Sequence, residues 1–462
     1  MDLAFLPATE QAELIRQREV SSSELVELYL ERIARLDPEL NAFVTVRPDD
    51  ALAEARAADA APGAAPFHGV PIAIKDLAAT KGIRTTYSSR AYSDYVPDFD
   101  AAVVRRIRDA GFVVLGKTNT PEFGTTAFTE SELNGATRNP WSLERTPGGS
   151  SGGAAAAVAA GLLPVAHGSD GGGSIRIPAS CCGLFGLKPA RGRVSTAPFA
   201  SLEGLSTAGP VARSVRDAAA LLDVMAGYEA GDPWWAPPPE RSFAEEVGAA
   251  PGRLRVAATS RSPIESAVDP ECTRALREAA DLLAGLGHDV VDETPPWADL
   301  ELSVAFISVW QVGPALHPVD DLSLFTPLNR ELVESARELS AAEYGRTVAR
   351  LQAYARRVVA FWRDVDVVLT PTLALPPVPI GWQDEAEGAV AQLLRNVEFT
   401  PFTGVANLTG LPAMSLPLSR SANGLPIGVQ AIGPPAGEAV LLRLAAQLEA
   451  ARPWAESRPA FS

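Results

Sequence analysis

Histidine and cysteine are scarce in this chain, and their scarcity argues against a metal site and against a disulfide framework. Among 462 residues there are four histidines and three cysteines. No two histidines have the HExxH spacing of a metallohydrolase, so we expect neither a metal nor a cofactor. Three cysteines, of which Cys181 and Cys182 are neighbours, do not make a disulfide framework, and their odd number favours a reducing compartment.

Positive charge and long hydrophobic runs are also lacking. The chain has 40 Lys and Arg against 56 Asp and Glu, a net charge of −16. Because binding to a phosphate backbone needs clustered basic residues, we expect no nucleic-acid partner. The most apolar long window, Gly152–Ala166, is mostly Ala and Gly and is too short to span a bilayer. With no secretory signal visible at the N-terminus, we expect no membrane partner and a cytoplasmic location.

Short apolar runs alternate with amphipathic stretches along the chain. Val70–Ile74 and Phe112–Gly116 are typical of buried strands, and Ser214–Met225 of an amphipathic helix. Strands that lead into helices across glycine turns indicate an α/β fold. Since no internal repeat interrupts this pattern, we expect one large α/β domain over residues 1–462, with a more variable helical region at about 300–400.

The first long helix has recognisable start and stop signals. Ser21 is followed three residues later by Glu24, which predicts a capping box ahead of the apolar stripe of LVELYLERIARL. Asp37 and Pro38 then predict its end.

The densest cluster of glycine and serine lies between Pro147 and Pro178. It contains GGSSGG around Ser150 and GGGS ending at Ser174, separated by an alanine-rich helix and a short strand. Because glycine lets backbone approach backbone or ligand closely, two such clusters suggest a site built from main chain with hydroxyls placed in it. A pair of flexible loops is the alternative interpretation.

A serine nucleophile in this stretch would need a base and oxyanion donors. His167 stands inside an apolar strand pattern, and no nucleophile elbow GxSxG surrounds Ser174. Lys75 follows the apolar strand Val70–Ile74, and burial there would lower its pKa and make it a base, with a second serine relaying the proton. The residues alone leave both a Ser–His–Asp and a Ser–Ser–Lys arrangement open.

Six separated blocks resemble the amidase signature family of serine hydrolases. They read GVPIAIKD, LGKTNTPEF, NPW, PGGSSGGAAAAVAAG, SDGGGSIRIPASCCGLFGLKPARGRV and the C-terminal TGLPAMSLPL with GLPIGVQ, and they are densest between His68 and Pro210. Agreement of six blocks is far more specific than any single motif. The resemblance implies a single amidase domain with a mixed central β-sheet covered by helices on both faces.

The resemblance also implies a role for each residue of the two clusters. Lys75 becomes the general base, Ser150 a relay preceded by a cis peptide bond, and Ser174 the nucleophile. The implied oxyanion donors are the backbone N–H groups of Gly171, Gly172, Gly173 and Ser174. The implied supporting residues are Ser151, Asp170 and Arg176. Gly171 departs from the family, which commonly has a branched residue there, and this departure predicts a looser or wider oxyanion loop.

Within the family, GATRNPW and HGSDGGGSIRIPAS are most similar to hydrolases of the 6-aminohexanoate cyclic dimer type, while aryl acylamidases and carbamate-cleaving relatives share the core. Since no Arg or Lys cluster prepares a site for a charged substrate, we expect a small, neutral, fairly apolar amide or carbamate. The residues expected to contact it are Gly124, Thr125, Phe128, Trp310, Phe399 and Phe402, although aromatic side chains commonly fill cores instead.

Two other functions remain open. One is the A subunit of a glutamine-dependent tRNA amidotransferase, which works with a partner. The other is a non-catalytic binding protein on the same scaffold, which the presence of Lys75, Ser150 and Ser174 disfavours. A homodimer is among the assemblies that the sequence allows.

Overall fold

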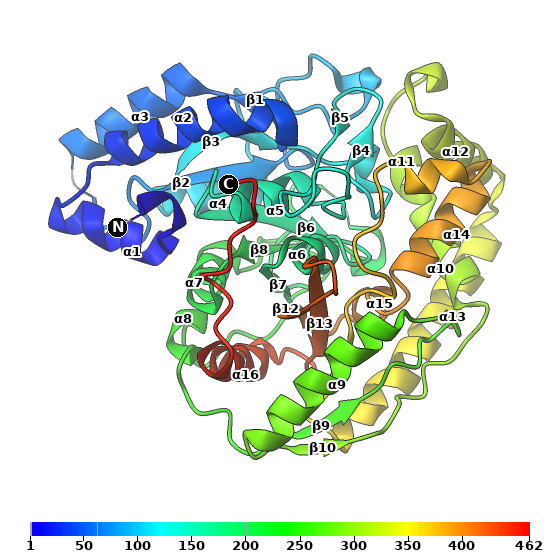
Figure 1. The fold of residues 1–462 in the computed structure, drawn as a ribbon. Coiled ribbons are helices and arrows are strands. Elements are labelled where there is room, and N and C mark those ends of the chain that lie inside the picture. The colour runs from blue at the N-terminus through cyan, green and yellow to red at the C-terminus, as the bar shows by residue number, and fades with distance from the viewer. Residues whose placement is uncertain (1, 62, 200) are drawn as a thin grey trace.

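One large β-sheet runs through almost the whole chain (Figure 1). The computed structural model describes residues 2–61, 63–199 and 201–462. Eleven strands make up this sheet, in the order β1-β3-β2-β6-β8-β7-β12-β13-β11-β9-β10, and two short strands pair separately. The strands are β1 (Phe43–Val46), β2 (Pro71–Lys75), β3 (Val113–Thr118), β4 (Glu130–Ser131), β5 (Gly135–Ala136), β6 (Val165–Asp170), β7 (Phe185–Lys188), β8 (Thr207–Ala212), β9 (Arg255–Ala258), β10 (Asp289–Val291), β11 (Val367–Pro371), β12 (Ala413–Arg420) and β13 (Pro426–Ile432).

The large sheet is mixed. Strand β2 pairs in parallel with β3 and β6, and β9 pairs in parallel with β10 and β11. The strands between these two parallel groups, from β6 through β8, β7, β12 and β13 to β11, pair antiparallel. The predicted α/β fold with a mixed central sheet is therefore confirmed.

Helices cover both faces of this sheet because successive strand residues point to opposite sides. On β2, Ile72 and Ile74 belong to one apolar cluster and Ala73 to another. The first cluster packs the sheet against α1 (Ala8–Gln17), α4 (Ala102–Asp109), α7 (Val215–Met225), α8 (Phe243–Glu246), α9 (Pro270–Gly285) and α16 (Glu438–Ala451). The second packs it against α2 (Ser22–Leu40), α3 (Pro48–Ala60), α5 (Gly152–Ala159) and α6 (Arg176–Cys182).

The predicted helical region contains five helices on one side of the molecule. They are α10 (Leu302–Trp310), α11 (Val312–Ala315), α12 (Pro327–Glu338), α13 (Ala341–Val359) and α14 (Ala389–Phe399), and α15 (Gly404–Thr409) follows. Figure 1 shows most of them gathered far from α2 and α3. A third apolar cluster joins α10, α13 and α15 to the C-terminal half of the sheet. Single 3-10 turns are η1 (Leu3–Phe5), η2 (Arg90–Tyr92), η3 (Glu122–Gly124), η4 (Leu202–Gly204), η5 (Leu322–Leu324), η6 (Ala360–Arg363) and η7 (Trp382–Glu385).

Helix α2 begins as predicted and ends later than predicted. The hydroxyl of Ser21 accepts from the N–H of Glu24 at 3.1 Å, and the Glu24 carboxylate accepts from the N–H of Ser21 at 2.7 Å. The prediction that Asp37 and Pro38 end the helix is wrong, because it continues to Leu40 with Pro38 inside it. Buried Leu40 holds the extra turn in the core. In the described ranges, no helix is long and apolar enough to cross a membrane.

Candidate active site

Lys75 lies at the carboxyl end of β2, between two parallel neighbours, and is completely buried. Its Nζ lies 2.8 Å from Ser150 Oγ, 2.9 Å from Ser151 Oγ and 3.1 Å from Ser169 Oγ. Burial lowers the pKa of Lys75 to about 7, an effect that the negative charge of Asp170 partly opposes. The lysine therefore has hydroxyl neighbours and a substantial neutral fraction near neutral pH.

His167 lies beside this cluster without joining its hydroxyl groups. Its Nδ1 accepts from the backbone N–H of Lys75 at 3.3 Å, and burial together with Lys75 lowers its pKa to about 3, so it is neutral. Across the described ranges, no histidine hydrogen-bonds to Ser150 or Ser174; the other three have partners elsewhere. The geometry thus places lysine, and not histidine, next to the predicted relay serine.

Ser150 follows the only non-proline cis peptide bond in the described chain, Gly149–Ser150. A Cβ atom on Gly149 would lie 2.9 Å from the backbone of Phe128, so only glycine fits there. The N–H of Ser151 donates to the carbonyl of Ser174 at 3.1 Å. This bond joins the two glycine-serine clusters, which the sequence separates by a helix and a strand, in one site.

Ser174 ends the segment Gly171–Ser174, which connects β6 to α6 and which we call the oxyanion loop after its predicted role; Ser174 is 7% exposed. Gly173 has a φ of +133°, and a side chain there would collide with the hydroxyl of Thr403. The N–H of Gly173 donates to Asp170 Oδ1 at 2.8 Å, so it already has an acceptor, and its role as an oxyanion donor stays a prediction. The N–H groups of Gly171, Gly172 and Ser174 have no acceptor among the described residues and are free to bind a substrate oxygen.

Asp170 and Arg176 form the predicted ion pair, and both are fully buried. Two bonds of 2.9 Å join them, from Arg176 Nε and Nη2 to the two carboxylate oxygens. Burial alone would raise the pKa of Asp170, but the guanidinium holds it well below its usual range. The pair fixes the two ends of the oxyanion loop relative to one another.

Three polar residues near the C-terminus complete this network, and the sequence reasoning missed them. Arg176 Nη1 donates to the carbonyl of Thr403 at 2.8 Å and to Gln430 Oε1 at 2.6 Å. Arg176 Nη2 donates to Asn407 Oδ1 at 2.7 Å, and Asn407 Nδ2 donates to Asp170 Oδ1 at 2.9 Å. The only available signal was the placement of polar residues in otherwise apolar segments.

The structure brings three of the predicted substrate contacts next to the predicted relay serine and oxyanion donors. A Cβ atom on Gly124 would lie 3.1 Å from Ser150 Oγ. The carbonyl of Thr125 accepts from Trp310 Nε1 at 3.1 Å, and the Trp310 ring lies against Gly171. These three residues therefore border the site from two directions.

The three phenylalanines predicted to contact substrate lie deeper. Phe399 and Phe402 are 0% exposed and Phe128 is 1% exposed. Phe128 stacks on Phe399 with ring centroids 5.2 Å apart. Phe399 and Phe402 present no surface to a substrate in this conformation, because both rings are enclosed by the core.

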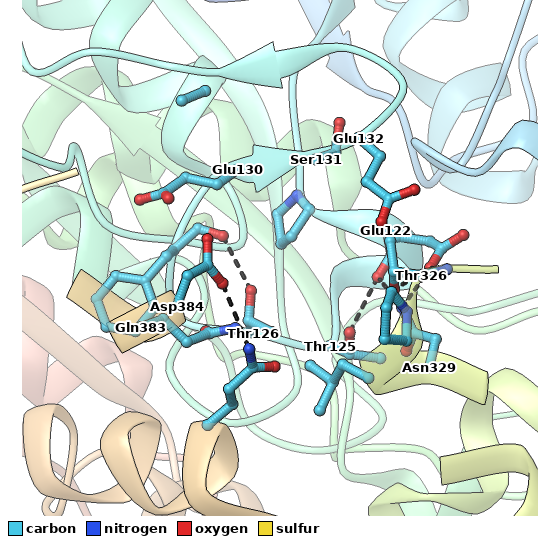
Figure 2. A pocket seen from close by; sticks show the side chains of 16 residues that line it. Glu122, Thr125, Thr126, Glu130, Ser131, Glu132, Thr326, Asn329, Gln383 and Asp384 are labelled. Atoms are coloured by element: carbon cyan, nitrogen blue, oxygen red, sulfur yellow. Dashed lines mark hydrogen bonds between the residues drawn. The ribbon is translucent and has the colours of Figure 1, made fainter. Parts of the chain in front are cut away.

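A cavity of about 470 Å³ adjoins the loop that contains Thr125 and Phe128 (Figure 2). Its lining carries carboxyl groups and no Lys or Arg; the acidic residues are Glu122, Glu130, Glu132 and Asp384. Burial raises the pKa of Glu130 to about 7, opposed by the bond that its carboxylate accepts from the N–H of Gly381. Such a lining is unfavourable for an anionic group.

Comparison with known proteins identifies the family of this chain. The sequence model of the Amidase family matches residues 24–442, and the chain belongs to this family. It is 45% identical to the putative amidase AmiB2 of Mycobacterium tuberculosis, with 100% of this chain and 99% of that protein covered. It is 41% identical to the 6-aminohexanoate-cyclic-dimer hydrolase of Pseudomonas sp., with 98% and 96% covered. The predicted resemblance is confirmed.

Solved structures give the same result. A 6-aminohexanoate cyclic dimer hydrolase complexed with substrate superposes with a TM-score of 0.92 at 39% identity, over 100% of both chains. A bacterial aryl acylamidase superposes with a TM-score of 0.87 at 27% identity, over 98% of this chain and 97% of that one. The protein is an amidase, an enzyme that acts on carbon–nitrogen bonds.

Proposed function

We propose that the protein hydrolyses small, neutral, fairly apolar amides through an acyl-enzyme on Ser174, with Ser150 as proton relay and Lys75 as base. The observation that carries the proposal is the 2.8 Å contact between Lys75 Nζ and Ser150 Oγ in a buried site. A neutral amine donates two hydrogen atoms and accepts one. With Ser151 and Ser169 accepting from Nζ, its lone pair is left for the proton of Ser150.

Acylation then needs one nucleophilic attack and one relayed proton. Ser174 Oγ attacks the amide carbonyl carbon while its proton passes to Ser150 Oγ and the proton of Ser150 passes to Lys75 Nζ. The carbonyl oxygen becomes an oxyanion, which the free N–H groups of Gly171, Gly172 and Ser174 stabilise. The proton returns through Ser150 to the amide nitrogen, the C–N bond breaks and the amine leaves.

Deacylation repeats these steps with water as the nucleophile. Water loses its proton through Ser150 to Lys75 and attacks the ester carbon of the acyl-enzyme. The second tetrahedral intermediate collapses, the bond from carbon to Ser174 Oγ breaks, and Oγ receives the proton back. The products are a carboxylic acid and the free enzyme. Metal and cofactor play no part in these steps.

The surroundings of the site support a neutral substrate. The neighbouring cavity carries carboxylates that would repel an acid, and the aromatic ring of Trp310 lies over the oxyanion loop. Relatives named for a cyclic amide dimer and for aryl amides fit this class. An aryl carbamate has the same carbonyl geometry and is the second candidate substrate. The amidotransferase subunit is not favoured, and a homodimeric, cytoplasmic enzyme remains a prediction.

A substrate panel and active-site labelling test this proposal together. The panel contains anilides, cyclic amides, linear amide oligomers and aryl carbamates, and release of amine is measured. We expect turnover of at least one class by the wild type, no turnover by Ser174→Ala, and fluorophosphonate labelling of the wild type alone. Labelling without turnover of any member would contradict the proposed substrate class. Absence of both would favour a non-catalytic scaffold, and glutaminase activity that needs a partner would favour the amidotransferase subunit.

A further inference from the structure

Gly171 lies directly against the indole ring of Trp310. A Cβ atom at position 171 would approach Trp310 Cη2 to 2.8 Å and Cζ3 to 2.9 Å. Because the interior is close-packed, a side chain at 171 and this position of the ring exclude one another. The backbone of Gly171, unlike that of Gly173, is not in the left-handed region. The neighbouring ring, and not the backbone conformation, therefore requires glycine at 171.

Trp310 also contacts the opposite side of the site. Its Nε1 donates to the carbonyl of Thr125 at 3.1 Å, and the preceding residue, Gly124, lies against Ser150. The ring thus bridges the oxyanion loop on one side and the segment beside the relay serine on the other. A change at Trp310 affects the space between these two parts of the site.

Phe306 extends the same aromatic surface. It lies one helical turn before Trp310, and the two rings stack with centroids 5.4 Å apart and an interplanar angle of 22°. The Cζ atom of Phe306 would lie 3.4 Å from a Cβ atom at Gly172, which is ordinary contact. We call Phe306 and Trp310 the aromatic wall. Both side chains are only partly buried, so the wall retains accessible surface.

Helix α10 holds the aromatic wall in place from behind. Ala305 and Val309, on the neighbouring face of α10, are buried in the third apolar cluster, against α13 and the sheet. Residues at 306 and 310 then fall on the face turned toward the glycines, because positions four apart share a helix face. The helix that carries the aromatic wall is therefore fixed by packing against the rest of the enzyme.

We infer that the aromatic wall is the specificity determinant of this enzyme. Trp310 occupies the space that a side chain at 171 would otherwise fill, and the exposed ring surface receives the apolar group beside the scissile amide. This inference rests on the proposed function and names the residues that select its substrates. It also revises the predicted effect of Gly171, because the ring fills the space that a missing side chain would have left open.

A double-mutant cycle tests the contact itself. Gly171→Ala alone should lower kcat/KM by roughly tenfold or more, because the added methyl group displaces the ring and the loop. In the Trp310→Leu background, Gly171→Ala should lower kcat/KM by less than about threefold, since the methyl group then has room beside position 310. The melting temperature should show the same pattern without any substrate. Equal costs of Gly171→Ala in both backgrounds would overturn the contact.

Two substrate series test the specificity. One varies the acyl group with aniline kept constant, and the other varies the amine with acetyl kept constant. Trp310→Leu should change the ratio of kcat/KM between bulky and small members by about tenfold in at least one series. Trp310→Phe keeps an aromatic ring, so its ratio of kcat/KM should lie between those of the wild type and Trp310→Leu. It replaces Trp310→Leu in the comparison if that variant does not fold. Trp235→Leu, at a tryptophan that is 72% exposed, is the matched control and should leave every ratio unchanged.

The outcomes separate this inference from the proposed function. Turnover by the wild type with unchanged ratios in both series for Trp310→Leu and Trp310→Phe would overturn the inference alone. Failure of the wild type to hydrolyse any member would overturn the proposed function and this inference with it. A changed ratio together with the non-additive cycle would establish Trp310 as the residue that sets the substrate range.

Discussion

Lys75 Nζ and Ser150 Oγ lie 2.8 Å apart, and neither side chain is more than 2% exposed. A lysine in water carries its proton up to a pKa near 10.5, and a protonated lysine cannot accept another. Burial lowers the pKa of Lys75 to about 7 and so gives it the free lone pair that a base needs. The apolar strand that brings Lys75 into the interior thus also determines its chemistry.

The first prediction concerns the pH dependence of activity. Since the neutral form of Lys75 is the proposed base, kcat/KM should rise with pH through about 7 and level off above it. The profile of an anilide substrate between about pH 5 and about pH 9 provides the measurement. Ser169→Ala, which removes one hydroxyl acceptor of Nζ, should shift the midpoint while keeping the shape. A rise centred near the ordinary lysine pKa would contradict a neutral Lys75.

The second prediction ranks the serines around Lys75. Ser150→Ala removes the proposed proton path and should lower kcat by at least about a hundredfold, whereas Ser169→Ala should lower it by less than about tenfold. Both remove one hydroxyl group from the same Nζ, so they form a matched pair. Single-turnover measurement of acylation gives the comparison. Equal losses would assign Ser150 a role in holding Lys75 and none in proton transfer.

The third prediction concerns the buried ion pair of the oxyanion loop. Arg176→Met leaves the Asp170 carboxylate buried without its partner, which should lower the free energy of unfolding by about 3–5 kcal/mol. Asp170→Asn combined with Arg176→Met should recover part of this loss, because no charge is then left in the interior. Urea unfolding of the four proteins measures the coupling. Simple addition of the two single effects would show that the pair does not stabilise the loop.

Local sequence patterns predicted those features of the site that depend on residues close together in the chain. The alternation of Val70–Ile74 placed Lys75 at the end of a strand, and the glycines marked the segments of Ser150 and Ser174. The end of α2 was missed because buried Leu40 outweighed the local stop signal of a proline. Tertiary packing decided that boundary, and packing is not readable from neighbouring residues.

Contacts between distant parts of the chain could not be predicted in the same way. Arg176 reaches Thr403, Asn407 and Gln430, which are 227, 231 and 254 residues away. The hydrogen bond from the Gly173 N–H to Asp170 depends on the orientation of the Asp170 side chain toward the oxyanion loop. Such contacts follow from the strand order of the sheet, in which the C-terminal strand β12 pairs with β7 of the N-terminal half.

The fourth prediction separates two reasons for glycine at position 173. Gly173→Ala adds a side chain at a φ of +133° and also against the hydroxyl of Thr403. Gly231→Ala is the matched control, because Gly231 has a φ of +100° with no atom within 4 Å of its Cβ position. Both should lose about 1 kcal/mol or more of stability from backbone strain, and Gly173→Ala should also lose activity. Unfolding and kcat of each variant are compared. Full activity of Gly173→Ala would contradict a rigid oxyanion loop.

The last prediction uses the cavity beside the site. Burial raises the pKa of Glu130 from 4.5 to about 7, so between these values the folded protein binds more protons than the unfolded one. The contribution of Glu130 to stability is therefore present at low pH and is lost as the pH rises through about 7. Relative to Glu130→Gln, the wild type should lose stability over this range, while Glu132→Gln, in the same cavity, should follow the wild type. Chemical unfolding at a series of pH values measures the difference. A wild type that instead gained stability over Glu130→Gln as the pH rose would show that a cation neutralises Glu130 in the folded enzyme.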